Sequence, residues 1–384
     1  MPSFTQEVEY LFLFSAVLIL PKIIKRFRIP IGITCIFLGL LCSFFWKSFN
    51  DDQLLLLLSR LGITSLFLFA GMEVEMEELK ENKGPISKHL ALNLLMIGFV
   101  SAFIGYFFHL DLRPAIILTI GLMTPSAGFI LDSISDFKLT KSHQYWIKSK
   151  SISEEILSVF ILFFAMQSHD ANQLIISIFI LVGLLTFLPI LFKVYVRYVA
   201  PYAPKSEVAF LIILALVCGV ITKKIGTYYL VGAFIVGLIA GRFKHFMGKV
   251  EGINIFNALS IFFGIFIPFY FFKAGLGFSS DHLNKEGFFV GLGFILILIP
   301  IRFLFILYTQ KKFVDNRVYK PWKISLSLMP NLIFGLVISS ILTERYNVDS
   351  SIIAGLFIYT IFTSILPTFS FKKVPPKEYD TSSA

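Results

Sequence analysis

The feature that most constrains this chain is a series of apolar stretches that continues from its beginning to its end. Each stretch is about as long as a helix must be to cross a hydrocarbon core roughly 30 Å thick, and charged residues gather between the stretches. The sequence therefore predicts an all-α membrane protein with about thirteen transmembrane helices. The predicted spans are residues 8–24, 29–46, 54–72, 88–110, 113–134, 147–168, 172–196, 207–225, 228–243, 253–278, 286–309, 322–343 and 350–371.

The composition excludes a soluble domain. Hydrophobic residues make up 56% of the chain and 45 residues are Phe, which is more apolar surface than a soluble domain of this length could bury. Because the apolar stretches recur to the C-terminus, we expect all of them to be retained rather than one to be removed as a signal peptide. The three cysteines and six histidines show no metal-ligand spacing, and the histidines lie in or near the predicted connections, so no cofactor is expected.

The positive charge is distributed unevenly across the predicted membrane. The net charge is +10, and most Lys and Arg residues fall in the connections on one side and in the C-terminal tail. The positive-inside rule places that side in the cytoplasm. We therefore expect a location in the cell (inner) membrane, with the N-terminus outside and the C-terminus in the cytoplasm. We therefore expect the excess of basic residues to lie beside the lipid bilayer, and we expect no nucleic-acid partner.

Three pairs of segments indicate an internal repeat. The segment "FLFAGMEVEMEEL" (Phe67–Leu79) resembles "YFFKAGLGFSSDHL" (Tyr270–Leu283), and "GLMTPSAGFIL" (Gly121–Leu131) resembles "SLMPNLIFGLV" (Ser327–Val337); "IFLGLL" also matches "FIVGLI". The separation is nearly the same in each pair, and it links spans an odd number of helices apart, so the halves must be inverted in the membrane. We predict six helices, one linker helix and six inverted helices, an arrangement typical of secondary transporters.

Proline interrupts corresponding spans of the two halves. Pro125 lies between Thr124 and Ser126, and Pro330 is followed by Asn331. Proline removes a helix hydrogen bond and clashes with the preceding turn, and in lipid the freed backbone groups need protein or cavity water. Either proline alone would indicate only a kinked helix. Their matching positions favour two broken helices that cross near the bilayer midplane, where substrate and ion sites usually lie.

Two adjacent carboxylates follow the first interruption. Glu154 and Glu155 lie inside the span 147–168, where a charged side chain usually faces a partner or a water-filled pathway. Neighbouring helix residues are about 100° apart, so we expect one glutamate to bind an ion at the crossing. The other would pair with Arg302, an isolated charge of the span 286–309. An ordinary polar helix end is the alternative interpretation.

These residue types predict a transporter that exchanges a monovalent cation for protons. Na⁺ and K⁺ prefer oxygen ligands, which a glutamate, the hydroxyls of Thr124 and Ser126, and freed carbonyls would supply. Burial disfavours the charged form of a carboxylate, so a proton would compete with the cation. The residues do not distinguish Na⁺ from K⁺, or Glu154 from Glu155 as the ion ligand. A sodium-coupled symporter of an organic anion is the alternative, and the lack of a nucleophile or metal cluster within a span argues against an enzyme.

Several segments together resemble the bacterial members of the cation:proton antiporter superfamily, the sodium/proton and potassium/proton exchangers. The most specific are "FLFAGMEVEMEEL", "TPSAGFIL", "SEEIL", "YYLVGAFIVGLIAG" and "PFYFFKAGL", and the resemblance covers nearly the full chain. It implies that the pair Glu154 and Glu155 binds the ion and that Arg302 is the accompanying basic residue of the eleventh span. The better-known pairs in that family are Asp-Asp or Asn-Asp.

The resemblance also implies a homodimer in which a core moves like an elevator against a scaffold. Residues 1–84 and 206–283 would form the scaffold and dimerisation helices, and residues 171–205 the linker helix. Residues 85–170 and 284–384 would form the ion-binding core, the second part ending in a short cytoplasmic tail. Many potassium-type relatives have a C-terminal nucleotide-binding regulatory domain, and we expect none in this chain.

Two further charged residues are accessory candidates. Lys273 lies near the end of the tenth span, where it either reaches the membrane surface or takes part in gating or in pairing with an acid. Asp132 follows the interruption in the fifth span, where it is either solvated by the cytoplasm or lines the entrance to the site.

Overall fold

The protein is helical throughout the part that its structure describes. The structure is a computed structural model that describes residues 4–27, 29–45, 49, 52–74, 82–134, 137–167, 171–203, 206–225, 229–243, 249–278, 285–314 and 320–370. The prediction of an all-α protein is confirmed for these ranges. The helices are α1 (Phe4–Ile24), α2 (Ile31–Phe45), α3 (Gln53–Met72), α5 (Lys83–Phe108), α6 (Leu112–Met123), α7 (Ala127–Ile134), α8 (Lys141–Gln167), α9 (Ala171–Val194), α10 (Glu207–Lys224), α11 (Tyr229–Phe243), α12 (Lys249–Gly264), α13 (Ile267–Leu276), α14 (Lys285–Phe313), α15 (Trp322–Ser327), α16 (Leu332–Tyr346) and α17 (Ser350–Ser370).

Helices long enough to cross a membrane occur along the whole described chain. By length and composition, seven segments qualify, and α2 and most of α11 are shorter apolar helices. The seven are Gln53–Met72, Lys83–Phe108, Leu112–Leu131, Ala171–Val199, Asn257–Leu276, Lys285–Phe313 and Ser350–Ser370. Every predicted span overlaps one helix or two consecutive ones. The prediction of a multi-pass membrane protein is confirmed, and the number of crossings stays a prediction.

The two predicted interruptions are present. Helix α6 ends at Met123 and α7 begins at Ala127, while α15 ends at Ser327 and α16 begins at Leu332. Proline alone does not cause these breaks, because α14 continues through Pro300. The interrupted segments differ from α14 in having polar neighbours that bind the freed backbone groups, as shown below for the site.

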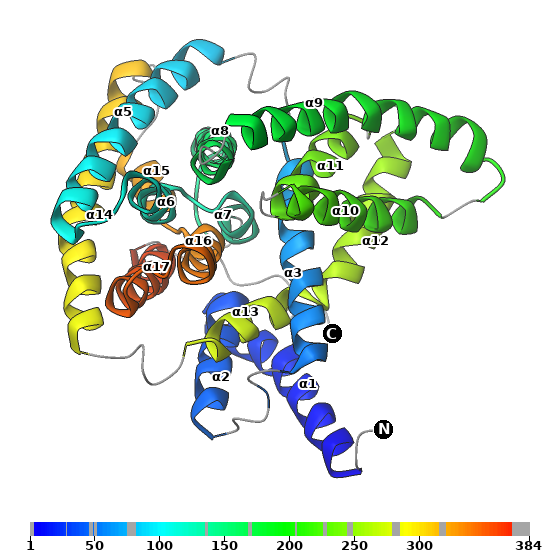
Figure 1. The fold of residues 1–384 in the computed structure, drawn as a ribbon, viewed down its shortest axis with the longest axis horizontal. Helices are drawn as coiled ribbons and strands as arrows, with labels where there is room; N and C mark the ends of the chain where they lie inside the picture. Colours follow the sequence, from blue (N-terminus) through cyan, green and yellow to red (C-terminus); the bar gives the residue numbers. More distant parts are fainter. Residues whose placement is uncertain are drawn as a thin grey trace.

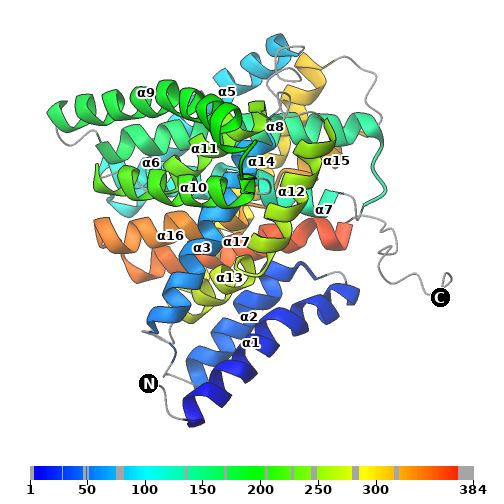
Figure 2. The same ribbon diagram turned by 90° about the vertical axis from the view of Figure 1, so that its right-hand side faces the viewer.

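The interrupted helices lie inside the bundle. In Figure 1, α5–α8 and α14–α17 lie together on the left and in the centre, α9–α12 lie on the right, and α1, α2 and α13 lie below. Helix α3 packs against α11 and α13, and α16 packs against α6 and α17. Figure 2 shows α1 and α9 at opposite borders of this bundle. The helices with the predicted site residues therefore form one group, and α1–α3 with α9–α13 form another.

Four glycines allow two very close helix crossings. Gly39 of α2 and Gly275 of α13 each lie so near the other helix that a Cβ atom would overlap a backbone carbonyl oxygen. Gly71 of α3 and Gly237 of α11 lie against each other's helices in the same way. Close backbone approach of this kind is common where membrane helices pack through small residues. These four glycines belong to the segment pairs that suggested the internal repeat.

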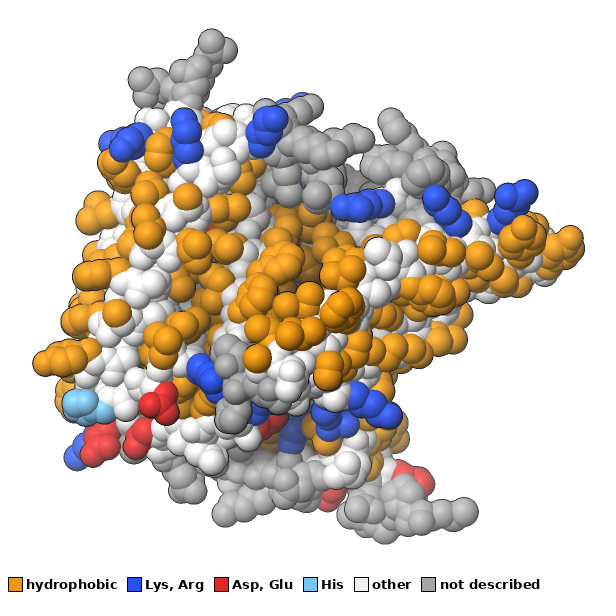
Figure 3. Space-filling model, turned by 45° about the horizontal axis from the view of Figure 1, so that its top comes forward, with side chains coloured by type: hydrophobic (Ala, Val, Ile, Leu, Met, Phe, Trp, Pro, Cys, Tyr) orange, Lys and Arg blue, Asp and Glu red, His pale blue; other side chains and the backbone are white. Residues whose placement is uncertain are grey.

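The surface of the described residues is strongly apolar. Figure 3 shows hydrophobic side chains over much of the visible face, with Lys and Arg along the upper edge and charges of both signs along the lower edge. Single aromatic side chains are almost fully exposed, for example Phe99 at 74% and Tyr106 at 82%. Apolar patches of this extent are rare on soluble monomers, and they fit a surface that contacts lipid.

Candidate functional site

The two interruptions contact each other directly. The backbone N–H of Ser126, between α6 and α7, donates to the carbonyl of Pro330, between α15 and α16, at 2.9 Å. Thr124, Pro125 and Ser126 form the first interruption, and Pro330 with Asn331 belongs to the second. The segment that contains Pro125 and the segment that contains Pro330 therefore lie side by side.

The N-terminal ends of α7 and α16 each face an acceptor from another element. Glu155 Oε2 accepts from the N–H of Ala127, the first residue of α7, at 2.8 Å. Ser126 Oγ accepts from the N–H groups of Ile333 and Phe334 at 3.0 and 3.1 Å. The first N–H groups of a helix lack partners within the helix and bear partial positive charge, so both acceptors stabilise the crossing.

A side-chain amide donates a hydrogen bond to a backbone carbonyl near the C-terminal end of α6. Asn331 Nδ2 donates to the carbonyl of Gly121 at 2.6 Å, and its Oδ1 accepts from Thr363 Oγ1 at 2.7 Å. Asn331 is fully buried. Its amide therefore links α6, α16 and α17.

Arg302 donates hydrogen bonds to the backbone carbonyls that follow the C-terminal end of α15. Its guanidinium donates to the carbonyls of Leu328 and Met329 at 3.0 and 3.1 Å and to the Tyr359 hydroxyl at 3.0 Å. Arg302 is 1% exposed, and the carbonyl end of a helix bears partial negative charge. The guanidinium is therefore stabilised by backbone carbonyl dipoles, and no carboxylate of the described residues hydrogen-bonds to it.

The predicted pairing of a glutamate with Arg302 is wrong. Glu154 Oε1 instead contacts His89 Nε2 of α5 at 2.7 Å, and among the described residues neither glutamate hydrogen-bonds to Arg302. The physical reason is direction: Glu154 projects from α8 toward α5, whereas the guanidinium of Arg302 reaches the loop between α15 and α16.

Glu155 is the glutamate that faces the crossing. It is 2% exposed and lies beside the start of α7. Thr124 Oγ1, on the other side of the interruption, shares a hydrogen bond of 2.6 Å with Ser158 Oγ, one turn along α8. Carboxylate and hydroxyl oxygens are ligands that hard cations prefer, so Glu155, Thr124 and Ser158 offer an oxygen-lined candidate site for a monovalent cation.

Ser126 has a different role from the one predicted. A hydroxyl oxygen has two lone pairs, and both are directed to the backbone N–H groups of α16. Ser126 therefore stabilises the helix end, and its oxygen has no lone pair left for a cation in this structure.

The sequence did not point to three functional candidates, which are His89, Lys150 and Thr309. His89 is 1% exposed and Lys150 is also 1% exposed, and both contact Thr309 Oγ1 of α14, His89 through Nδ1 at 2.9 Å and Lys150 through Nζ at 3.4 Å. The expectation that the histidines lie in or near connections is wrong for His89, because α5 begins at Lys83 and includes it. An ionisable residue just inside a predicted span was the signal available.

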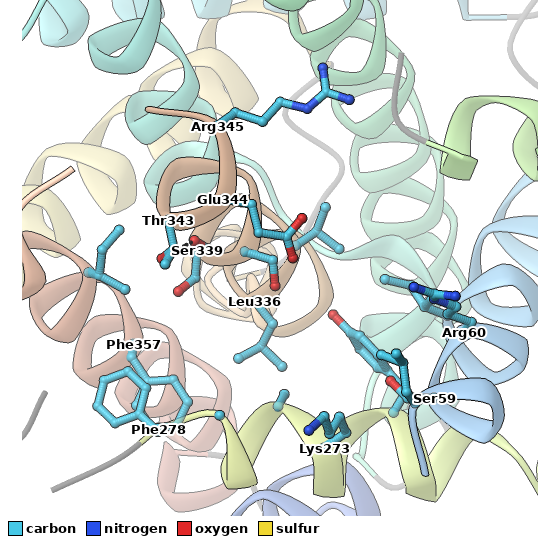
Figure 4. Close-up of a pocket in the computed structure, with 18 of the residues that line it drawn as sticks. Ser59, Arg60, Lys273, Phe278, Leu336, Ser339, Thr343, Glu344, Arg345 and Phe357 are labelled. Carbon is cyan, nitrogen blue, oxygen red and sulfur yellow. Dashed lines mark hydrogen bonds between the residues drawn. The ribbon is translucent and has the colours of Figure 1, made fainter. Parts of the chain in front are cut away.

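Two cavities separate the helix groups. One of about 380 Å³ lies between α3 and α13 on one side and α16 and α17 on the other. Figure 4 shows Arg60 and Lys273 on the first side and Glu344 on α16 around it. Lys273 is partly buried and lines this cavity, so the structure does not bring it to Glu155.

The second cavity adjoins the crossing. It has about 390 Å³ and is lined by Glu73, by Gly128 of α7 and by Ile333 of α16, among others. Gly128 follows the residue whose N–H binds Glu155. The side chain of Asp132, the predicted entrance residue, lies outside the described part of the structure.

Interrupted helices that meet in an apolar bundle around a buried carboxylate define a multi-pass integral membrane protein of the transporter class. The sequence matches the model of the sodium/hydrogen exchanger, transmembrane, over residues 12–374. The chain therefore belongs to this family, and the resemblance to the cation:proton antiporter superfamily is confirmed.

Named relatives agree with this family. The chain is 23% identical over 266 residues to the Na⁺/H⁺-K⁺ antiporter GerN of Bacillus cereus, a match that covers 66% of this chain and 65% of GerN. It thus spans slightly less than two thirds of that relative. It is 24% identical over 277 residues to the probable Na⁺/H⁺ antiporter 3 of Methanocaldococcus jannaschii, covering 70% of each chain.

A solved structure has the same fold. The sodium proton antiporter MjNhaP1 from Methanocaldococcus jannaschii, determined at pH 8, superimposes with a TM-score of 0.66 at 15% sequence identity. The match covers 95% of this chain and 96% of that one.

Proposed function

We propose that this protein is a secondary antiporter that exchanges a monovalent cation, Na⁺ or K⁺, for protons across the membrane. The observation that supports this most is the Glu155 carboxylate, buried at the crossing of two interrupted helices and bound to the N-terminal N–H of α7. Family membership supports the same class of transport. The relatives' names include sodium in each case and potassium for GerN, and both cations remain candidates for this chain.

Competition at one carboxylate would couple the two ions. An ionised, unoccupied carboxylate is costly in a low-dielectric interior, whereas a protonated or cation-bound one is close to neutral. Only the loaded forms would then pass between the two sides of the membrane at low cost. Each passage with a cation in one direction must be followed by a passage with a proton in the other, so exchange follows without a further component.

An elevator movement would give the site access to each side in turn. In this proposal residues 85–170 and 284–384 form the moving core, and residues 1–84 and 206–283 form the scaffold. The two cavities support it, because both lie between these groups, at different ends of α16. The linker is residues 171–205.

An inverted repeat of six, one and six helices would explain the symmetry of the scaffold. Gly39 and Gly237 occupy equivalent places in the matched segments, as do Gly71 and Gly275. The crossing of α2 with α13 and that of α3 with α11 use these glycines in the same way. We also propose that the chain crosses the membrane thirteen times and forms a homodimer. The N-terminus would lie outside the inner membrane, and the basic upper edge in Figure 3 would then face the cytoplasm.

The test is transport by the purified protein in liposomes with an internal pH dye. Pulses of NaCl, KCl or LiCl should move protons, and Glu155→Gln should abolish this flux. Glu286→Gln, an exposed glutamate at the start of α14, should transport like the unmodified protein. Competition requires the half-saturating cation concentration to rise about tenfold for each unit by which pH falls on the acid side. Full flux in Glu155→Gln would reject the site.

A sodium-coupled symporter of an organic anion is the second candidate. It is favoured by the basic lining of the first cavity, which includes Arg60, Lys223 and Lys273. The same liposomes discriminate the two candidates, because a symporter would take up its anion with sodium and move no protons in the cation pulse.

A further inference from the structure

The first cavity, which lies between α3 and α13 on one side and α16 and α17 on the other, is lined by an excess of basic side chains. Arg60 of α3, Lys223 of α10 and Lys273 of α13 line it from the proposed scaffold. Glu344 and Arg345, near the end of α16, line it from the proposed core. Among the lining residues that the structure describes, four side chains are therefore cationic and one is anionic.

We propose that the first cavity binds a multivalent oxyanion of the phosphate type between the proposed scaffold and the proposed core. The anion stays bound and is not transported, and it slows cation/proton exchange by holding the two helix groups together. Its binding is independent of the proposed function. Its effect on transport rests on that function.

The basic residues of this cavity lie where the sequence otherwise has few. Arg60 is in the first half of α3, and Lys223 and Lys273 are in the last turns of α10 and α13. In the proposed orientation these parts of the helices face outward, whereas most Lys and Arg residues lie on the cytoplasmic side. The positive-inside rule accounts for the cytoplasmic residues, but not for cations that converge from three helices on the opposite side. A ligand of opposite charge accounts for them.

The size and the walls of the cavity suit a small anion. Its volume of about 380 Å³ lies within the range of small-molecule sites. Parts of the wall are apolar, among them Leu336, Val337 and Phe357. Apolar walls lower the local dielectric constant and strengthen the attraction between an anion and the surrounding cations. Ser59 and Ser339 also line the cavity, and a hydroxyl group can turn to donate a hydrogen bond to an anion.

A bound oxyanion would contact both helix groups at once. Figure 4 shows Arg60 and Lys273 on one side of the cavity and Ser339 and Glu344 of α16 across from them. An oxyanion has several acceptor oxygens, so it can accept hydrogen bonds from the cations of one group and from a hydroxyl of the other. An elevator movement would displace one group relative to the other. An anion bound to both groups therefore resists that movement.

Glu344 is the negative charge that limits this binding. Its exposed side chain extends from α16 at the cavity (Figure 4), where its carboxylate repels an anion. Glu344→Gln removes this charge and keeps a side chain of the same size, so the affinity for an oxyanion should rise. A gain of affinity is informative because a variant that is only destabilised would lose binding.

The direct test is a titration with inorganic phosphate, which is mostly a dianion at pH 8. The full-length protein is held in dodecyl maltoside, a detergent without phosphorus, and binding is measured from the ³¹P NMR line width of the phosphate. Glu344→Gln should strengthen binding about threefold, the effect of one charge on a dianion at roughly 10 Å in water with partial screening by salt. Arg60→Gln combined with Lys223→Gln removes two exposed cations and should weaken binding about tenfold.

Lys285→Gln is the matched control. Lys285 is an exposed basic residue at the start of α14, on the outer side in the proposed orientation, and it does not line the cavity. This variant should bind phosphate like the unmodified protein. A line width that does not depend on the protein, or equal affinity in all of these proteins, would overturn the proposal.

Competition distinguishes two sources of the phosphate group. Glycerol 3-phosphate and a short-chain phosphatidic acid carry the same headgroup, and only the second has acyl chains. Displacement of inorganic phosphate at lower concentrations of the phosphatidic acid would identify a lipid headgroup as the ligand. Equal displacement by both would identify a soluble anion, and either result supports the site.

The transport arm uses sulfate, an oxyanion that does not buffer protons near neutral pH. Added to both sides of the liposomes as its N-methylglucamine salt, sulfate should lower the cation-driven proton flux of the unmodified protein more than chloride does at equal ionic strength. The Arg60→Gln, Lys223→Gln double variant should be inhibited less, and Lys285→Gln should be inhibited like the unmodified protein. Equal flux in sulfate and chloride would reject the control of transport. Sodium-driven uptake of labelled sulfate would overturn retention of the anion and favour the symporter.

The anion site and the cation site fail separately. Phosphate binding can be measured in Glu155→Gln protein, in which we expect no transport. Flux that persists in Glu155→Gln would reject the cation site, while the NMR titration would still decide the anion site. Should the double variant not fold, the gain of affinity in Glu344→Gln decides the anion site by itself.

Discussion

One step along α8 separates two glutamates with different partners. Neighbouring helix residues point about 100° apart, so Glu155 reaches the N–H of Ala127 while Glu154 reaches His89. Position also sets the role of Ser126. Its hydroxyl oxygen accepts hydrogen bonds from the backbone of α16 and is not directed toward an ion site. At this scale the role of a residue is decided by direction and by the number of lone pairs, not by residue type.

Asp349 allows a prediction at this scale. It precedes α17, and its Oδ1 accepts from the N–H and the hydroxyl of Ser351 at 2.7 and 2.6 Å. These hydrogen bonds hold the pKa of the Asp349 carboxyl below its usual value. A depressed pKa gives stability that is present above the unfolded pKa, about 3.9, and that is lost as pH falls through the folded pKa. Asp349→Ala should cost about 1 kcal/mol at pH 7.

Thermal unfolding in detergent checks this expectation. Asp349→Ala should melt at a lower temperature at pH 7, and the difference from the unmodified protein should shrink toward pH 3. Asp349→Asn, which keeps an acceptor for the same N–H, should stay close to the unmodified protein at pH 7. Equal melting of all three proteins at pH 7 would contradict the capping role.

Helix pairs in the scaffold are held by backbone contact rather than by side chains. Gly39 and Gly275 bring α2 against α13, and Gly71 and Gly237 bring α3 against α11. A carbonyl oxygen of a helix cannot move aside as a flexible side chain can, so these positions accept no Cβ. Each close crossing should therefore be a rigid unit.

Alanine substitutions test this at the scale of the element. Gly39→Ala and Gly237→Ala should each destabilise the fold by about 1–3 kcal/mol or more, and by similar amounts if the two crossings are repeat-related. Gly98→Ala on α5 is the control, because nothing lies within 4 Å of its Cβ position. It should be neutral or stabilising by up to about 1 kcal/mol. Thermal unfolding in detergent measures all three, and an undisturbed Gly39→Ala would contradict the close crossing.

At the scale of the whole molecule, the two cavities lie between the helices of the proposed scaffold and those of the proposed core. Phe278, two residues after the end of α13, stacks on Phe357 of α17 with ring centroids 3.7 Å apart, and this contact joins the proposed scaffold to the proposed core. Phe108 and Phe294, 5.7 Å apart, join α5 to α14 within the core. An elevator movement must break the first contact and preserve the second.

Cysteine cross-linking therefore tests the movement. Phe278→Cys with Phe357→Cys, once oxidised, should arrest proton flux in liposomes, and reduction should restore it. Phe108→Cys with Phe294→Cys should cross-link without loss of flux. The native cysteines Cys35, Cys42 and Cys218 are buried, which limits side reactions. Unchanged flux in the cross-linked first pair would exclude a core that moves against this part of the scaffold.

The membrane class, the helical fold, the two interruptions and the buried carboxylates could all be predicted from the order of the amino acids. These features depend on local properties of the chain: the length of an apolar stretch, the missing N–H of proline and the cost of a charge inside a span. They can therefore be predicted without knowing which helices contact each other. The matched segments containing Gly39, Gly71, Gly237 and Gly275 were visible for the same reason.

The hydrogen-bond partners of the buried polar side chains could not be predicted in this way. His89 and Glu154 are 65 positions apart, and Arg302 lies 26 and 27 positions from the carbonyls that it binds. Which side chains meet depends on the rotation of each helix about its axis and on where it begins, and a shift of one residue turns a side chain by about 100°. Arg302 was therefore assigned to the wrong partner, and His89 was overlooked, because helix rotation and tertiary packing are set by the whole bundle.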